Sequence, residues 1–371
     1  MKKFTLVSSM AAGLSLLLAG GALAAVNPAA PNPYPTRESK VLADFESAAM
    51  VTSDPNGTGG NLASINNDPQ FVAEGSKSLK LDLTGVAAGW HDPEFTINFP
   101  QPLDIKGYQV LSMEVFIPDD SISASYYQFG PHPMTTSPGD DTMTSSTYYG
   151  PGNMQAGWNH LIWVLKNGTD SKITQLAVAG ASGADYTGPI YLDDIRVYKG
   201  NFVGLQPDEK LIMGFDKPTD NDFFTTLGDT VTVAVNTDKQ FISQGDSSLK
   251  IDLTGHAGGF TNNVARADDW GTTIDASKAT AIHVDVFVPV GSYTATDWHE
   301  VGFGVVGDGG DVSGFAHGVV DGQWIALEIP LTPDQAKMLT NVKGMFFITN
   351  SGSDWTGPIY VDNLRAVMPA Q

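Results

Sequence analysis

The stretch GSKSLKLDLTG at residues 75–85 returns as GDSSLKIDLTG at residues 245–255, with eight identities in eleven positions. A second pair of segments, TGPIYLDDIRV at 187–197 and TGPIYVDNLRA at 356–366, shares seven of eleven residues at nearly the same offset. That offset is about 170 residues. It far exceeds the roughly 20–50 residues of a solenoid repeat. The chain of 371 residues therefore contains a duplicated domain.

The repeated segments have the pattern of β-strands. Both pairs alternate apolar and polar residues, as half-buried strands do. Between them, EVFIP at 114–118 matches DVFVP at 285–289, and both are rich in β-branched and aromatic residues. Clusters of Gly, Asn, Asp and Pro separate such segments about every ten residues. This pattern predicts an all-β fold of two antiparallel β-sandwiches in tandem.

The domain boundaries follow from the positions of the repeats. The first sandwich is expected over residues 41–199 and the second over 209–371. Residues 200–208, GNFVGLQPD, contain the Gly and Pro typical of a linker. One short helix is expected over 332–339, where Pro333 occupies a favourable first helical position after Thr332.

The first 25 residues resemble a secretory signal peptide. Two lysines precede a mostly apolar run, and the A-x-A sequence that ends at Ala24 is a cleavage signal. We therefore expect a secreted protein, extracellular or periplasmic, cleaved near Ala24 or Ala25. Residues 26–40 contain four prolines and are expected to be an extended lead-in.

Composition excludes several classes of partner and chemistry. The formal net charge is -21, with 20 Lys and Arg against 41 Asp and Glu. Nucleic acid and anionic membranes are therefore not expected as partners, because both attract clustered positive charge. The absence of cysteine excludes disulfides, thiolate nucleophiles and zinc-thiolate sites.

Several motifs together resemble a β-jelly-roll carbohydrate-binding module. They are an opening DFE or GFD strand, a G-x-x-SLK-x-DL strand, a strand ending in V-F-x-P, a lone Trp before an apolar strand and a closing GPIY-x-D strand. Modules of this type are appended to bacterial mannanases, glucanases and xylanases. The resemblance implies two jelly-roll domains and a polysaccharide or oligosaccharide ligand, expected to be of the mannan or β-glucan type.

The same resemblance implies one structural Ca²⁺ in each domain. In such modules the first and last strands lie side by side and hold the ion with acids and backbone carbonyls. Glu46 and Asp216 occupy equivalent places in the first strands, and Asp193 and Asp362 in the last. Oxygen ligands of this kind suit calcium. The alternative is that these acids are solvated positions on edge strands.

Aromatic side chains are the candidates for sugar contacts, because the C–H faces of a pyranose stack on flat rings. Trp90 and Phe260 follow the SLK strands in Gly-rich loops, and Trp355 precedes a TGPIY strand, where it either lines a rim or packs beneath it. Trp158 and Trp324 recur at equivalent strand starts and are expected in the core.

The two copies differ most between the V-F-x-P strand and the matched Trp, so this region is expected to determine the ligand. Adjacent strand residues point to opposite faces. Only one member of each neighbouring pair can therefore face a groove, and core packing is the alternative for each. The candidates are Tyr126, Tyr127, Tyr148 and Tyr149 in the first copy, and Trp298 and His299 in the second.

Catalytic motifs are not recognisable in the sequence. A glycosidase needs two carboxyl groups about 5–9.5 Å apart. None of the eight Glu residues lies in a known catalytic motif, and nucleophile elbows and H-E-x-x-H are missing. We therefore expect a non-catalytic binding protein. The alternatives are a polysaccharide-degrading hydrolase or lyase and a structural cell-surface protein.

Overall fold

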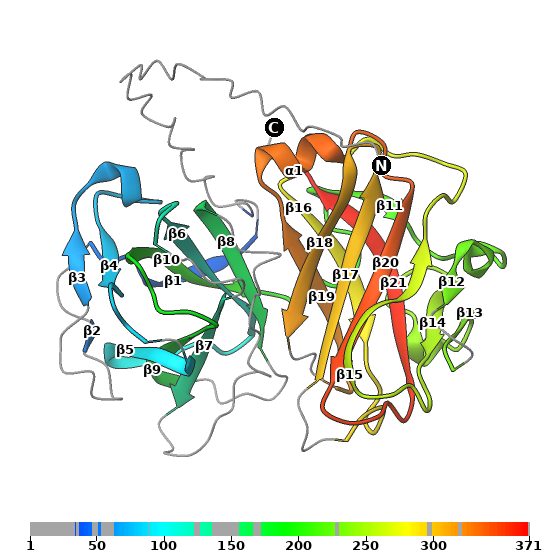
Figure 1. Ribbon diagram of the computed structural model, residues 1–371, viewed down its shortest axis with the longest axis horizontal. Coiled ribbons are helices and arrows are strands. Elements are labelled where there is room, and N and C mark those ends of the chain that lie inside the picture. The colour runs from blue at the N-terminus through cyan, green and yellow to red at the C-terminus, as the bar shows by residue number, and fades with distance from the viewer. Residues whose placement is uncertain are drawn as a thin grey trace, which may run out of the picture.

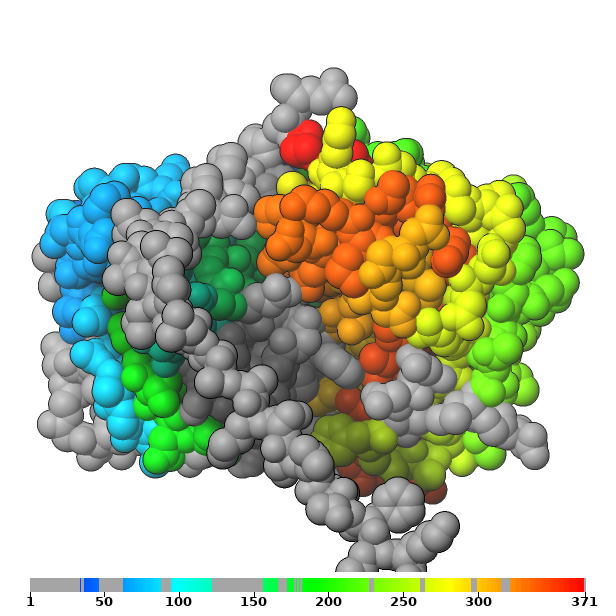
Figure 2. Space-filling model, turned by 45° about the horizontal axis from the view of Figure 1, so that its top comes forward, coloured from blue at the N-terminus to red at the C-terminus, as the bar shows by residue number. Residues whose placement is uncertain are grey.

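The computed structural model describes residues 34, 37–46, 51–52, 63–87, 89–121, 127–135, 156–165, 172–226, 230–294, 299–317 and 321–369. Figure 1 shows two β-sandwiches side by side, which confirms the all-β prediction. In the space-filling view (Figure 2), the first sandwich, blue to green, and the second, light green to red, occupy opposite sides of the molecule. No helix among the described residues is long and apolar enough to cross a membrane.

The first sandwich has two antiparallel sheets. One sheet has the order β3-β4-β10-β6-β8, with β1 also paired to β10, and the other has the order β2-β5-β9-β7. The strands are β1 (Ser39–Ala43), β2 (Val51–Thr52), β3 (Ala63–Asn66), β4 (Ser78–Asp82), β5 (Gly89–Asp104), β6 (Tyr108–Ile117), β7 (Tyr127–Thr135), β8 (Gly157–Val164), β9 (Lys172–Ser182) and β10 (Pro189–Lys199).

The second sandwich repeats this order. Its sheets run β13-β14-β21-β16-β19, with β11 paired to β21, and β12-β15-β20-β17-β18. The strand β18 has no counterpart among the described strands of the first sandwich. The strands are β11 (Glu209–Met213), β12 (Thr225–Thr226), β13 (Thr232–Asn236), β14 (Ser248–Asp252), β15 (Gly259–Ala267), β16 (Ala281–Phe287), β17 (His299–Gly307), β18 (Gly310–His317), β19 (Trp324–Pro330), β20 (Gly344–Ser351) and β21 (Pro358–Val367).

The sequence repeats form the central strands of each sandwich. The SLK segments are β4 and β14, and the GPIY segments are β10 and β21. The first strand of each copy pairs with the last, β1 with β10 and β11 with β21, as the resemblance implied. Along one edge β10 pairs first with β4 and then with β1, and its other edge pairs with β6. The last strand of each copy therefore has three partners.

Short helices cap the loops. The 3-10 helices are η1 (Pro69–Phe71), η2 (Asp220–Phe223) and η3 (Lys239–Phe241), and the α-helix is α1 (Pro333–Met338). The helix α1 begins after Thr332, whose side chain accepts a hydrogen bond from the Gln335 amide while the Gln335 side chain binds the Thr332 backbone. This capping box confirms the helix expected there.

Each sandwich buries its own core between its sheets. Val301, Phe303 and Val305 of β17 face the core of the second sandwich, and Trp163 lies in that of the first. Trp158 and Trp324 were expected in the core, and this is wrong. They lie opposite Phe116 and Phe287, on the sheet faces directed away from the core, because the alternation of β6 and β16 puts those positions outward.

Candidate functional site

The candidate sugar face of the second sandwich is the outer face of the sheet β12-β15-β20-β17-β18. The core-facing residues of β17 alternate with Glu300, Gly302 and Gly304, which therefore point outward. The strand register places Phe260 of β15, Asn350 of β20 and Glu300 of β17 in one row, which His317 of β18 extends. Residues from four different strands thus meet in one line across the sheet.

This row combines an exposed ring with a buried polar pair. Phe260 has 80% of its surface exposed, the highest fraction among the exposed large apolar residues of the described chain. Beside it the Asn350 side chain donates a hydrogen bond of 2.8 Å to Glu300 Oε2, and both residues are buried. A flat apolar ring next to an oriented amide and carboxylate provides both kinds of contact that a sugar requires.

In the neighbouring rows of this face, a glycine leaves room for an aromatic ring. At Gly304 a Cβ atom would lie 2.2 Å from Cζ of Phe346, so the Phe346 ring lies across the strand at a position where no side chain fits. Phe346 packs with Val306 and Ile348 in a separate apolar cluster on this face. Arg266 lies 5.0 Å above the Phe346 ring. The face therefore changes from polar at Glu300 to apolar at Phe346.

The first sandwich has the same row with different residues. Trp90 of β5, Ala181 of β9 and Gln128 of β7 are in register at the places of Phe260, Asn350 and Glu300. The register therefore pairs the predicted Trp90 and Phe260. In the same register, Gln128 stands at the position of Glu300 and Ala181 at that of Asn350. The side chain of Trp90 lies outside the described residues.

The other predicted aromatic residues are distributed differently. Tyr127 begins β7 and His299 begins β17, in equivalent register positions. The His299 ring stacks on Tyr293 with 3.5 Å between centroids and shares the face of Val301, so it lies beneath the sheet rather than on the candidate face. Outside the described residues lie Tyr126, Tyr148, Tyr149 and Trp298.

Trp355 is reassigned to the core. It is 1% exposed and packs edge-on against Tyr293, 6.0 Å between centroids. A ring this buried offers no face to a sugar, so of the two alternatives left by the sequence it packs beneath the TGPIY strand. The matched Tyr186 is 2% exposed and lies in the first core.

Sequence reasoning missed Asn350 and did not single out Glu300 as a sugar contact. Neither lies in a motif, and the two are fifty positions apart. Only the pairing of β17 with β20 brings them together. The one available signal was that Glu300 follows Trp298 and His299 in the region where the copies diverge.

The four acids predicted as calcium ligands hold loops by hydrogen bonds. Asp193 Oδ2 accepts from the amides of Ala73 and Glu74, at 2.8 and 3.1 Å, and Glu46 Oε1 accepts from those of Ser76 and Lys77, at 2.5 and 2.8 Å. The loop between η1 and β4 is therefore held at both ends by carboxylates.

The second sandwich repeats this arrangement. Asp362 Oδ2 accepts from the amides of Ser243 and Gln244, at 3.0 and 3.2 Å, and Asp216 Oδ1 from those of Asp246 and Ser247, at 2.7 and 3.3 Å. Gly245 follows with φ +79°, and a Cβ there would lie 2.3 Å from Asp216 Oδ1. Glycine is thus required both by its backbone conformation and by the close carboxylate.

As arranged, these residues do not fit a calcium ion. Their oxygens point at N–H donors, whose partial positive charge repels a cation. Among the described residues there is also no group of three His, Cys, Asp or Glu placed to hold a metal. Burial raises the pKa of Asp193 and of Asp362 to about 7, although three backbone N–H groups act on each to lower it. Calcium binding stays a prediction.

We expect Asp362→Asn to destabilise the second sandwich by about 2 kcal/mol, because an amide group replaces an oxygen that accepts several hydrogen bonds. Urea unfolding measures this loss, and Asp354→Asn, which breaks one exposed bond to the Gly258 amide, is the control. Equal stability of the two variants would contradict the hydrogen-bonding function. A calcium-dependent rise in melting temperature, abolished by both Asp193→Asn and Asp362→Asn, would establish the calcium site instead.

No protein-family model matches the chain, and no curated protein matches it. Solved structures that are similar include the tandem CBM22 domains of Xyn10C from Paenibacillus barcinonensis, with 14% identity over 90% of this chain and 99% of that chain and a TM-score of 0.29.

Two single modules are also similar. One is CBM27-1 of Caldicellulosiruptor saccharolyticus in complex with mannohexaose, with 19% identity over 43% of this chain and 96% of that one and a TM-score of 0.31. The other is the family 11 module of Clostridium thermocellum with a mixed-linked tetrasaccharide, with 13% identity over 44% and 96% and a TM-score of 0.27. All three are carbohydrate-binding modules, the class that the sequence motifs resemble. The fold itself is defined by the strand order described above.

Proposed function

We propose that this chain is an exported, non-catalytic protein that binds a polysaccharide on the outer faces of the sheets β2-β5-β9-β7 and β12-β15-β20-β17-β18. The observation that supports this most is the exposed Phe260 ring beside the buried Asn350–Glu300 pair. A pyranose stacked on Phe260 would place its hydroxyls within reach of an amide and a carboxylate that are already oriented.

A neutral polysaccharide suits this face better than an acidic one. The chain carries a formal net charge of -21, and Glu300 contributes a carboxylate to the face itself. Both repel uronic acids and sulfated sugars. Mannan and β-glucan, which are uncharged and rich in hydroxyls, are the polysaccharides we propose.

The two carboxylates of the β17–β18 pair are too far apart to act together on one glycosidic bond. On the described part of the second face, Asp311 is the other acid of the β17–β18 pair, opposite Val306 and six residues along the strand from Glu300. Six residues of strand span about 20 Å. This exceeds the roughly 5–9.5 Å over which two carboxyl groups act on one glycosidic bond. Asp311 is moreover paired with Arg266 at 2.9 Å.

The test is affinity electrophoresis in gels that contain mannan, β-glucan or xylan. We expect Phe260→Ala to weaken retention about tenfold, the loss of one stacking contact, and Phe260→Trp to preserve it, since Trp90 is the matched residue of the first copy. Val290→Ala, which truncates another exposed apolar residue, is the control. Full retention of a Trp90→Ala/Phe260→Ala double variant, in which both matched rings are removed, would exclude these faces, and release of reducing sugar from any of the polymers would favour the hydrolase or lyase alternative.

A further inference from the structure

The two sandwiches share a small apolar core of their own. Val110, Ile162 and Tyr198 lie on the outer face of a sheet of the first sandwich. They contact residues on the outer face of a sheet of the second sandwich. The second sandwich contributes Ala281, Ala326 and Val367, and the linker contributes Phe202. The eighth member is Tyr34, which precedes the first strand and belongs to the lead-in.

Tyr34 inserts fully between the two sandwiches. It is 0% exposed, and its ring lies 5.7 Å from Tyr198 of the first sandwich and 5.9 Å from His283 of the second, between centroids. Its hydroxyl is 3.0 Å from His283 Nε2 and donates to Glu328. The residue that leads into β1 thus bonds to β16 and β19 of the other sandwich.

Arg37 adds a second contact across the same junction. Its guanidinium lies 3.9 Å above the ring of Phe202 and 4.4 Å from that of Tyr34. It also binds the carboxylates of Asp208 and Glu209, at 3.1 and 3.2 Å. Because the side chain of Arg37 is only 8% exposed, these contacts are little screened by solvent.

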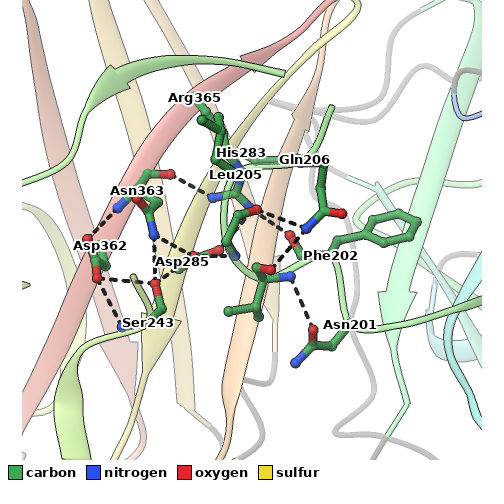
Figure 3. A network of polar contacts seen from close by, with 12 residues as sticks. Asn201, Phe202, Leu205, Gln206, Ser243, His283, Asp285, Asp362, Asn363 and Arg365 are labelled. Atoms are coloured by element: carbon green, nitrogen blue, oxygen red, sulfur yellow. Dashed lines mark hydrogen bonds and ion pairs between the residues drawn. The ribbon is translucent and has the colours of Figure 1, made fainter. Parts of the chain in front are cut away.

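The second sandwich presents a specific socket for this segment. His283 is held between Glu209, at 2.7 Å, and Glu328, at 2.8 Å, and all three side chains are fully buried. Figure 3 shows how Arg365 and Asp285 continue the network behind His283 toward Asn363. The ring of His283 therefore meets Tyr34 in a fixed orientation.

The socket exists on only one of the two copies. In register, His283 corresponds to Ser112 of the first sandwich and Glu328 to Ile162. Ile162 packs into the shared core instead. The first sandwich contacts the Tyr34 ring through His160, 5.7 Å away between centroids, which pairs with Glu114. The duplicated positions thus carry complementary residues on the two sides of the junction.

We propose that Tyr34 and Arg37 act as a clasp, by which the segment before β1 binds the socket on the second sandwich and holds both sandwiches in one orientation. The linker contributes to the same junction, since its Gly204 amide and Phe202 carbonyl bind Asp285 and Arg365 of the second sandwich and the Phe202 ring lies 5.6 Å from Tyr198 of the first. The clasp adds the polar contacts that join the segment before β1 to the second sandwich. The inference goes beyond the proposed function and needs no sugar for its test.

The reference is the chain that lacks only the first 25 residues. It is compared with one chain that begins at residue 38 and another that begins at residue 33. The shorter chain lacks the clasp but keeps β1, and the longer one keeps both. We expect the shorter chain to show a larger radius of gyration by small-angle scattering, and chymotrypsin to cut its linker at Phe202 about tenfold faster, since cleavage follows the population of the open state. The chain from residue 33 should match the reference.

A full-length Tyr34→Ala/Arg37→Ala variant guards against misfolding of the truncated chain, and far-ultraviolet circular dichroism monitors its β-structure. The clasp predicts the same expansion and faster cleavage in this variant. If its scattering profile and cleavage rate equal those of the reference, the proposal is overturned, whatever the truncated chain does.

Discussion

Arg365→Ala is expected to destabilise the second sandwich by about 3–5 kcal/mol, the cost of leaving buried charges without their partner. The guanidinium is 0% exposed and bridges Glu209, at 2.7 Å, and Asp285, at 2.8 Å. It also donates to the carbonyl of Phe202, at 2.6 Å. A further hydrogen bond goes to the carbonyl of Asn363, at 2.6 Å, and alanine removes all four interactions at once. Urea unfolding followed by circular dichroism measures the loss.

The matched residue of the first copy is the control. Arg196 binds Asp194 at 2.5 Å and also Glu74, whose side chain is 61% exposed. Water can solvate Glu74 once the arginine is gone, whereas the buried Asp194 loses its partner, so we expect Arg196→Ala to cost less than Arg365→Ala, about 2 kcal/mol. Equal losses for the two variants would show that the buried network at Arg365 has no special weight.

Glu328→Gln is expected to change how stability depends on pH. Burial raises the pKa of Glu328 well above 4.5, whereas burial lowers the pKa of His283 from 6.5 to about 4. Between these two pKa values the folded pair therefore holds one proton, on Glu328. The groups around it are Tyr34, Arg37, Glu209, Asp285 and Arg365.

The signs follow from counting protons. A lowered histidine pKa gives stability that is lost as pH falls below 6.5, and a raised glutamate pKa gives stability that is lost as pH rises above 4.5. Between these values the unfolded pair also binds one proton, so the two effects cancel. Above pH 6.5 the pair weakens the fold by about 1.4 kcal/mol per unit until Glu328 ionises.

Chemical unfolding at pH 5 to 8 measures how the free energy of unfolding changes with pH in the wild type and in the variant. Relative to the wild type, Glu328→Gln should gain about 1.4 kcal/mol for each pH unit from pH 5 up to the pH at which Glu328 ionises in the folded wild type, because its side chain no longer ionises. Taking the difference removes the contributions of Asp193 and Asp362, which both proteins share. A pH-independent difference would show that Glu328 is charged in the folded state.

The sequence predicted the parts of the fold that are repeated. The SLK and GPIY segments became central strands, their copies identified two domains, and the first and last strands pair as the resemblance implied. Thr332 and Pro333 located the helix because capping is a local property. Local signals and repetition were sufficient for these features.

Features made by distant strands were not predictable. Trp158 and Trp324 were expected in the core because they recur at equivalent positions of the two copies. Recurrence does not indicate which face of the sheet a side chain occupies. The Asn350–Glu300 pair depends on the register of β17 and β20. The contact of Tyr34 with His283 joins residues 249 positions apart and two domains. A lead-in rich in proline offered no sign of such a contact.

The strands β10 and β21 each pair with three other strands, and this affects how the chain folds during biosynthesis. Each sandwich receives its central strand last, so β1, β4 and β6 lack their common partner until residues 189–199 have been made. Contacts over such separations form slowly. A nascent chain that ends before residue 189 therefore has no complete first sheet. Each half should fold as a unit, the N-terminal one first, only after its final strand leaves the ribosome.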